Sequence, residues 1–404
     1  MTVDQIVPAA GRVDLPAALV SVMNHESLEP FSDEIIEFCG SFSRSIFKDH
    51  EALQYPELQA LAFWMRLAEL IRLREAFTAL ERPDALLMPR GVTFHIPPAN
   101  VDTIFIYSWL LSVLAGNRNI IRLSLRVSPQ IEILCRLFNQ TLAAAPASLK
   151  NSTLMVRYGH EREITQAISA AADVRVIWGG DASVNAIRSV PLPPHARELT
   201  FPDRFSFAVI HASAYLQAED RRPLAEQFFN DTFWFDQMGC SSPRLVFWCG
   251  SPEDTAKASA VFLEAVRQHA VQKKYQVQTA TRLNRFTFAC LAAMEGSASS
   301  YQDLTELTVL GLERFEQLSR EHCGGGLLFQ YRVSDLLDIA PFVNRRDQTM
   351  TYFGFEKHEL TDFARRLKGR GVDRIVPTGQ ALNFNRFWDG NDLLLEFMRY
   401  VYIA

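Results

Sequence analysis

Residues 91–124 read GVTFHIPPANVDTIFIYSWLLSVLAGNRNIIRLS. The first part, 91–100, has the apolar pattern of a short β-strand and ends on a proline-rich turn. The apolar run at 103–116 contains no charged residue and is shorter than the ~20 residues that span a bilayer, which indicates a buried helix. A Gly-Asn pair then marks a helix end, and 119–124 has the pattern of a second strand. This strand–helix–strand unit predicts a parallel sheet.

The same alternation continues on the C-terminal side of this stretch. Further elements are expected as strands at 154–158 and 174–178 and as helices at 130–144, 161–172 and 181–188. After a run of prolines, a second α/β stretch is expected as strands at 205–211, 244–249 and 327–333 and as helices at 219–235 and 252–270. Repeated strand–helix alternation with short apolar strands is typical of doubly wound sheets. The expected fold class is therefore α/β, with two doubly wound, Rossmann-like domains.

The composition limits the classes of protein that need to be considered. The chain has 404 residues, of which 48% are hydrophobic and 22% charged, and its net charge is −5. These values are typical of a globular protein with two or three domains, and the acidic balance argues against a nucleic-acid partner. The 6 cysteines show no CxxC pattern, so neither a zinc site nor a disulfide framework is expected. A reducing, cytoplasmic setting fits best, and the first residues have no signal-peptide pattern.

The two ends of the chain are less regular. Residues 1–30 contain prolines at 8, 16 and 30 and are expected to wrap over the surface. A helical pattern covers 32–81. The tail, 387–404, is expected to form a helix followed by an apolar strand that pairs with another element or another subunit.

The strongest candidate for a reactive side chain is Cys240, in the segment DQMGCSSPR at 236–244. It lies on a turn of small residues between an expected helix and an expected strand, where its sulfur can be reached. A nearby arginine, Arg244, and a helix end would lower the pKa of the thiol, and the thiolate is the reactive form. The alternative is that Cys240 is a small buried hydrophobic residue.

Asn100 stands at the carboxyl end of the first strand, where parallel sheets place ligands. Its amide group would donate a hydrogen bond to a developing oxyanion. The alternative is that its side chain caps the helix that follows.

Two further segments have features of nucleotide sites. Arg122 and Ser124 end the second strand, Arg126 follows it, and no acidic residue lies among them. They suit a ribose or a 2′-phosphate; the alternative is that the arginines face solvent. Trp178 is followed by Gly179 and Gly180, where the backbone can approach a ligand and a helix N-terminus favours anions. This is not the complete G-x-G-x-x-G fingerprint, and Gly-Gly is also an ordinary tight turn. The histidines have no metal-ligand spacing, and no G-x-S-x-G serine hydrolase motif is present.

In this order, the segments resemble the aldehyde dehydrogenase superfamily, and most closely its fatty acyl-CoA reductase branch, the LuxC family. The resemblance covers 85–404. The matching segments are 96–100, 114–124, 178–180, 240–244, 348–349 and 388–390. It implies an aldehyde dehydrogenase-like fold with two doubly wound domains and a small C-terminal oligomerisation element.

The resemblance also implies roles for the candidate residues. Asn100 would contribute to the oxyanion hole, and Cys240 would be the nucleophile. Arg122 stands where the family usually has a lysine that binds the adenosine ribose. Gly179 and Gly180 stand at the glycine turn beside the pyrophosphate.

One departure from the superfamily pattern is informative. Aldehyde-oxidising members have Glu-Leu-Gly-Gly where this chain has Phe201-Pro-Asp-Arg204, and that glutamate activates the water that releases the acyl group. Without the base, an acyl-cysteine should survive until hydride arrives, as a reductase requires. Glu198 is close enough in sequence to compete for the same place in the alignment.

The resemblance therefore implies NADPH-dependent reduction of an acyl thioester, expected to be fatty acyl-CoA, through an S-acyl-Cys240 intermediate. NADPH is favoured over NADH because Arg122 and Arg126 have no acidic neighbour. Three alternatives stay open: delivery of the acyl group by a carrier protein or by a partner acyl-protein synthetase, an acyltransferase or thioesterase without nicotinamide, and a non-catalytic binding subunit. A homo-oligomer without a membrane span is expected.

The expected domains are an N-terminal helical segment (1–84), a cofactor domain (85–203), a catalytic domain (204–375) and a C-terminal oligomerisation segment (376–404).

Overall fold

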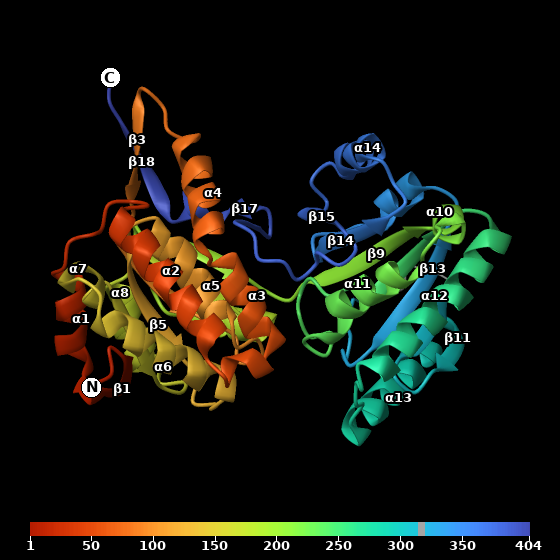
Figure 1. Ribbon diagram of the computed structural model, residues 1–404, viewed down its shortest axis with the longest axis horizontal. Helices are drawn as coiled ribbons and strands as arrows, with labels where there is room; N and C mark the ends of the chain where they lie inside the picture. Colours follow the sequence, from red (N-terminus) through yellow and green to blue (C-terminus); the bar gives the residue numbers. More distant parts are fainter. Residues whose placement is uncertain (314–319) are drawn as a thin grey trace. The chain divides into compact units, whose positions relative to one another are not determined.

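The computed structural model describes residues 1–313 and 320–404. The chain divides into two compact units. Unit 1 comprises Met1–Pro202 and Phe384–Ala404, and unit 2 comprises Asp203–Asn383. Each unit contains a seven-stranded sheet (Figure 1). Within the described residues, no helix is both long enough and apolar enough to cross a membrane.

The sheet of unit 1 has the strand order β2-β1-β6-β5-β4-β7-β8. Its strands are β1 (Thr2–Val7), β2 (Gly11–Asp14), β4 (Val92–Ile96), β5 (Arg118–Leu123), β6 (Thr153–Arg157), β7 (Val174–Trp178) and β8 (Arg197–Phe201). The five strands from β4 to β8 are parallel. From β4 the chain builds outward through β5 and β6, and then places β7 on the other side of β4. This reversal is the switch point beyond which doubly wound sheets bind ligands.

The helices of unit 1 are α1 (Leu15–Met23), α2 (Asp33–Lys48), α3 (Pro56–Trp64), α4 (Leu67–Thr78), α5 (Ile104–Leu114), α6 (Pro129–Ala143), α7 (Ala147–Lys150), α8 (Arg162–Ala170) and α9 (Asp181–Arg188), with a 3-10 turn, η1 (Ala52–Gln54). Every residue of α5 is buried, as its sequence without a charged residue predicts. Its Trp109 packs edge-on against Phe38 and Phe42 of α2 and Phe138 of α6. These aromatic contacts hold α5 against α2 and α6.

The prediction for the first 30 residues is wrong. Residues 2–14 form the hairpin β1–β2, and β1 adds to the edge of the sheet by pairing antiparallel with β6. Val3 and Val7, at two positions of β1, are buried. The expectation of a helical segment over 1–84 therefore fails for this hairpin, because its partner strand lies about 150 residues further along the chain and local sequence does not reveal it.

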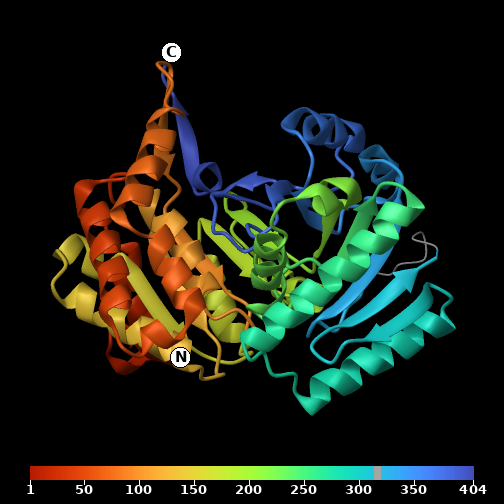
Figure 2. The same ribbon diagram turned by 45° about the vertical axis from the view of Figure 1, so that its right-hand side comes forward.

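The C-terminal residues return to unit 1 as β16 (Phe387–Trp388), β17 (Asn391–Asp392), α15 (Leu393–Glu396) and β18 (Met398–Tyr402). The expected tail helix is thus only four residues long. The expected terminal strand is present, and β18 pairs antiparallel with β3 (Ala85–Pro89). This β3–β18 ribbon projects from the rest of unit 1 and carries the C-terminus at its tip (Figures 1 and 2).

The sheet of unit 2 has the order β11-β12-β13-β10-β9-β14-β15. Its strands are β9 (Phe205–His211), β10 (Leu245–Cys249), β11 (Ala298–Asp303), β12 (Thr308–Leu312), β13 (Leu327–Val333), β14 (Asp347–Phe353) and β15 (Arg374–Pro377). All are parallel except the edge strand β11. The fold is therefore α/β with two doubly wound sheets, as expected.

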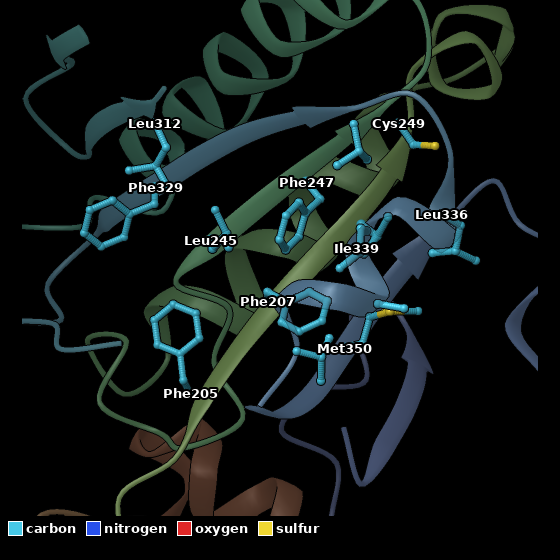
Figure 3. Packing of buried hydrophobic residues seen from close by; sticks show 14 of the residues in the cluster. Phe205, Phe207, Leu245, Phe247, Cys249, Leu312, Phe329, Leu336, Ile339 and Met350 are labelled. Atoms are coloured by element: carbon cyan, nitrogen blue, oxygen red, sulfur yellow. The ribbon is translucent and has the colours of Figure 1, made fainter. Parts of the chain in front are cut away.

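Helices cover both faces of this sheet. One face carries α10 (Ala212–Gln217), α11 (Arg222–Phe233) and α12 (Pro252–Gln272). The other carries α13 (Thr279–Met294), α14 (Lys357–Leu367) and the 3-10 helix η2 (Leu336–Phe342). Alternate strand residues enter the two cores, and Figure 3 shows the second, where Phe207 and Phe247 of neighbouring strands pack edge-on at 5.3 Å. The amino ends of β9, β10 and β14 are thereby held rigidly, and the loop with Cys240 lies there.

Candidate active site

Cys240 lies in the loop between α11 and β10 and is half-buried. Its carbonyl oxygen accepts a hydrogen bond from Ser206 Oγ at 2.7 Å. Its Sγ accepts one from Gln348 Nε2 at 3.6 Å. Strands β9 and β14 therefore hold both the backbone and the sulfur of this residue.

Arg244 supplies a buried positive charge next to Cys240. Its side chain is 2% exposed, and its guanidinium donates to the carbonyl oxygens of Gly239 at 3.0 Å and Cys240 at 3.4 Å. Burial lowers the pKa of Arg244 to about 10, and the negative charge of the Cys240 thiolate opposes that shift. The guanidinium thus stays charged at neutral pH and favours the thiolate.

The expected helix end is not a source of positive charge at Cys240. The nearest helix, α11, ends at Phe233 ahead of the cysteine, and the C-terminal end of a helix carries partial negative charge. That part of the prediction is wrong, and Arg244 is the group that favours the thiolate.

The turn before Cys240 is fixed by Gln237. Gln237 has a positive φ of 61°, is fully buried, and donates to the carbonyl oxygens of Pro243 and Leu327, both at 2.9 Å. Close packing near this turn leaves no room for a side chain at Gly324, where a Cβ would lie 2.5 Å from Met238 Sδ. The sequence alone indicates no role for Gln237 and Gly324, because the contacts here join segments about 90 positions apart.

The remaining cysteines are poorer nucleophiles or lie elsewhere. Burial raises the pKa of Cys135 and of Cys249 to about 12 and that of Cys323 to about 11, and it raises the pKa of Cys39 as well. These four are protonated thiols at neutral pH. Cys290 is exposed on α13. Among the residues that the structure describes, no group of three or more His, Cys, Asp or Glu side chains could hold a metal ion.

Asn100 lies in the loop beyond the carboxyl end of β4 and is exposed. The N-cap of α5 is Thr103, so Asn100 does not occupy the capping position that the alternative interpretation requires. A hydrogen bond holds this loop in place next to Asn100: Arg126 Nη1 donates to the carbonyl oxygen of Ala99 at 2.7 Å.

The three candidate residues at the end of β5 and just beyond it have different contacts. Arg122 is half-buried; its Nη2 donates to the carbonyl oxygen of Gly159 at 2.5 Å and its guanidinium lies 5.2 Å from the ring centre of Tyr158. Ser124 is half-buried just beyond the strand, and Arg126 is exposed. Arg122 is therefore held by the protein, whereas part of the Arg126 guanidinium faces solvent.

The glycine pair follows β7, which lies beside β4 at the switch point. Gly179 has a φ of 157°, and Gly180 is the N-cap of α9 without a side-chain hydrogen bond. Gly180 has no side chain that could cap the first turn of α9, which suits a phosphate oxygen at this helix N-terminus. Together with the Arg126 cation, these features fit a nicotinamide dinucleotide. Trp178 is buried and stacks on Phe201 with ring centres 3.8 Å apart.

Phe201 and Glu198, the two residues that compete for the position of the superfamily's base, differ in their surroundings. Phe201 is buried at the end of β8, with its ring against Trp178. Glu198, the competing carboxylate, accepts hydrogen bonds from Arg175 Nε at 2.8 Å and Arg188 Nε at 2.9 Å. Glu198 is thus engaged in structural ion pairs, and the alignment that places Phe201 at the position of the base is physically reasonable.

The candidate residues form two sets. Asn100, the 122–126 segment and the 178–180 segment follow the carboxyl ends of the neighbouring strands β4, β5 and β7 in unit 1. Cys240 and its contacts lie at the amino ends of β9, β10 and β14 in unit 2. Ser206 and Gln348 contribute contacts that the sequence alone did not predict, although the Gln348-Thr349 pair is part of the family resemblance.

Comparison with known proteins shows the family of the chain. The sequence profile of the family described as Acyl-CoA reductase (LuxC) matches residues 77–400. The long-chain acyl-protein thioester reductase of Aliivibrio fischeri is 26% identical over 302 residues, which cover 72% of this chain and 59% of that protein. The corresponding protein of Vibrio harveyi is 22% identical over 321 residues, covering 78% and 63%. The chain thus spans less than two thirds of the length of these relatives.

Solved structures show the same fold. The apo betaine aldehyde dehydrogenase of Staphylococcus aureus has a TM-score of 0.67 at 13% identity, covering 100% of this chain and 92% of that one. An NAD-dependent benzaldehyde dehydrogenase of Corynebacterium glutamicum has a TM-score of 0.67 at 13% identity, covering 100% and 93%. The fold is therefore that of the aldehyde dehydrogenases, and the profile match over most of the chain shows that this protein belongs to the LuxC family of acyl-CoA reductases.

Proposed function

We propose that this protein reduces an acyl thioester to an aldehyde with a reduced nicotinamide cofactor, through an acyl group carried on Cys240. The observation that carries the proposal is a half-buried cysteine that interacts with the charge of the buried Arg244. The alignment that puts Phe201 where the superfamily has its deacylating base supports it. The names of the related reductases support the same reaction class.

The first half of the reaction uses side chains of this protein alone. The Cys240 thiolate attacks the thioester carbon, and the resulting oxyanion is stabilised by the Asn100 amide and the backbone N–H of Cys240. Collapse of this intermediate breaks the bond to the carrier sulfur, which leaves as a thiolate and takes a proton from solvent. Because no carboxylate is available at Phe201 to activate water, the S-acyl enzyme persists.

The second half needs the cofactor, which when bound supplies a hydride to the acyl carbon. The product on Cys240 is a thiohemiacetal. Its carbon–sulfur bond then breaks, the electron pair stays on Cys240 Sγ, and the aldehyde is released. Arg244 favours this step for the same reason that it favours the free thiolate.

NADPH is the proposed cofactor, with NADH as the alternative. The exposed part of the Arg126 guanidinium suits a 2′-phosphate, and Ser124 suits a ribose hydroxyl. Arg122, whose guanidinium is bonded to the carbonyl oxygen of Gly159, adds positive charge at the end of the same strand. Gly179, Gly180 and the backbone N–H groups at the start of α9 would hold the pyrophosphate. The S. aureus aldehyde dehydrogenase has been solved in complex with NAD+, so its fold accommodates this class of cofactor.

The carrier of the acyl group defines the specific substrate. The family description favours coenzyme A, and we propose a fatty acyl-CoA as the first substrate. The names of the relatives favour an acyl-protein, so a carrier protein or an acyl-protein synthetase partner is the second candidate.

We further propose that residues 85–203 form the cofactor domain, 204–375 the catalytic domain and 376–404 an oligomerisation segment. The β3–β18 ribbon supports the last assignment, because it projects from unit 1 and exposes Leu86, Met88, Tyr400 and Tyr402. Sedimentation of the protein should give a homo-oligomer that a Tyr400→Glu, Tyr402→Glu double variant shifts to smaller species.

The proposal is tested by following oxidation of NADPH and of NADH with long-chain acyl-CoA, acyl-carrier protein and acyl-protein thioesters. We expect aldehyde to form in proportion to cofactor oxidised, with none formed by Cys240→Ser and undiminished formation by the matched variant Cys290→Ser. Fatty acid or a transferred acyl group without cofactor oxidation would instead show a thioesterase or acyltransferase.

A further inference from the structure

Strand β14 begins with a bulge opposite the second residue of β9. Asp347 pairs with Phe205 and Met350 pairs with Phe207, so Gln348 and Thr349 both stand opposite Ser206. A bulge adds one residue to a strand and changes the direction of its side chains, and bulges are frequent beside active sites.

Ser206 connects this bulge to the nucleophile. Its Oγ accepts a hydrogen bond from the backbone N–H of Thr349 at 3.2 Å and donates to the carbonyl oxygen of Cys240 at 2.7 Å. One hydroxyl group thus fixes the distance between the bulged strand and the Cys240 backbone, and both Ser206 and Thr349 are buried.

The bulge places the Gln348 amide against the Cys240 sulfur. Gln348 is completely buried, its Nε2 lies 3.6 Å from Cys240 Sγ, and its Oε1 lies 3.4 Å from Thr349 Oγ1. A buried amide needs hydrogen-bond partners. A thiolate has no proton to donate, so only the N–H side of the amide can pair with it, while the Thr349 hydroxyl serves the oxygen.

We propose that Gln348 is a further catalytic residue, which donates a hydrogen bond from Nε2 to the Cys240 sulfur and stabilises its negative charge. Its role in reduction rests on the proposed function. A donor at this place acts twice: it increases the fraction of thiolate that attacks the thioester, and it stabilises the same thiolate when the thiohemiacetal collapses. In that collapse the carbon–sulfur bond breaks, its electron pair remains on sulfur, the hydroxyl proton passes to solvent, and the aldehyde forms.

The direct test is the pH dependence of Cys240 alkylation by iodoacetamide, measured on the Cys240 peptide by mass spectrometry. Gln348→Met keeps the side-chain volume but removes the donor. A hydrogen bond to a charged group contributes enough to move the midpoint of the profile upward by about one pH unit and to slow alkylation at neutral pH about tenfold. Gln348→Glu should move the midpoint further, because it places a carboxylate against the thiolate. The Cys290 peptide of the same samples is the internal control and should keep its profile.

Folding of each variant is checked by urea unfolding. Gln348→Asn is a second variant that tests the contact with Cys240 Sγ. It keeps an amide but is one methylene too short to reach Sγ, so its profile should also move upward. Identical midpoints in the parent protein and in every folded variant would overturn the proposal.

Steady-state kinetics then separate this inference from the proposed function. Gln348→Met should lower kcat about tenfold with an acyl thioester and leave KM nearly unchanged. If the parent protein reduces no acyl thioester but the alkylation profile still moves, the proposed function fails while the Gln348–Cys240 contact stands. If the parent is active and the profile and kcat do not change, Gln348 is not catalytic.

Discussion

Nη2 of Arg244 donates to the carbonyl oxygen of Gly239 at 3.0 Å, so a buried guanidinium is bonded to the residue directly before Cys240. Its Nη1 reaches the carbonyl oxygens of Arg204 at 3.1 Å and Cys240 at 3.4 Å. The guanidinium thus has two roles, because it shapes the turn and places positive charge beside the sulfur.

Replacing Arg244 by lysine should destabilise the protein although the charge is kept. A lysine cannot reproduce the planar fork that satisfies several carbonyl groups, and carbonyls left unpaired in a buried turn cost about 2–3 kcal/mol of unfolding free energy. Urea unfolding measures this loss. The matched control is Arg222→Lys in α11, whose side chain is exposed and whose unfolding midpoint should not change. Equal midpoints for Arg244→Lys and the parent would show that the fork is unimportant.

Asn100→Ala should reduce turnover without affecting stability. Loss of one oxyanion donor typically lowers kcat by about 100- to 1,000-fold. Because Thr103 rather than Asn100 stands at the helix N-cap, the melting temperature should stay within a degree or so of the parent value. Full turnover with a lowered melting temperature would mean that Asn100 is a structural residue after all.

Arg126→Ala should change cofactor preference. A guanidinium–phosphate contact contributes about 10- to 100-fold in affinity, so kcat/KM with NADPH should fall by that factor relative to NADH. The ratio is the informative quantity, because loss of the Arg126 contact with Ala99 would affect both cofactors alike. An unchanged ratio would remove Arg126 from the 2′-phosphate site.

His95 should make the protein sensitive to acid. Burial lowers the pKa of His95 from 6.5 to about 4, against a smaller opposing effect of its hydrogen bond with Asn119. The unfolded chain therefore takes up a proton near pH 6.5 that the folded protein resists until about pH 4, and stability falls as pH is lowered through this window, by up to about 3 kcal/mol.

The matched variants for this effect are His95→Gln and His50→Gln. His50 is exposed in the same unit. His95→Gln should flatten the dependence of the urea midpoint on pH between 6.5 and 4, whereas His50→Gln should follow the parent curve. Parallel curves for all three proteins would assign the acid sensitivity to other groups.

Local sequence pattern was sufficient for the elements whose character is set by their own residues. The short apolar strands β4, β5, β7 and β9 and the fully apolar helix α5 were predicted within about two residues. The Cys240 turn was also predictable, because small residues between a helix and a strand limit the local conformations.

Features that depend on distant partners were not predictable. The N-terminal hairpin was missed because β1 needs the edge of β6. The direction of Gln348 depends on a bulge that exists only when β14 pairs with β9. The contacts of Arg244 likewise depend on a turn whose carbonyl groups point toward its guanidinium. Residue types alone do not indicate that arrangement.

The central claim is that Cys240 holds an acyl group for reduction. The most direct measurement is to mix the protein with a long-chain acyl-CoA without reduced cofactor, digest it, and locate the acyl group by mass spectrometry. We predict one acyl group on the Cys240 peptide that persists and is converted to aldehyde when NADPH is added. An acyl group on another cysteine, or release of free fatty acid before NADPH is added, would contradict the account.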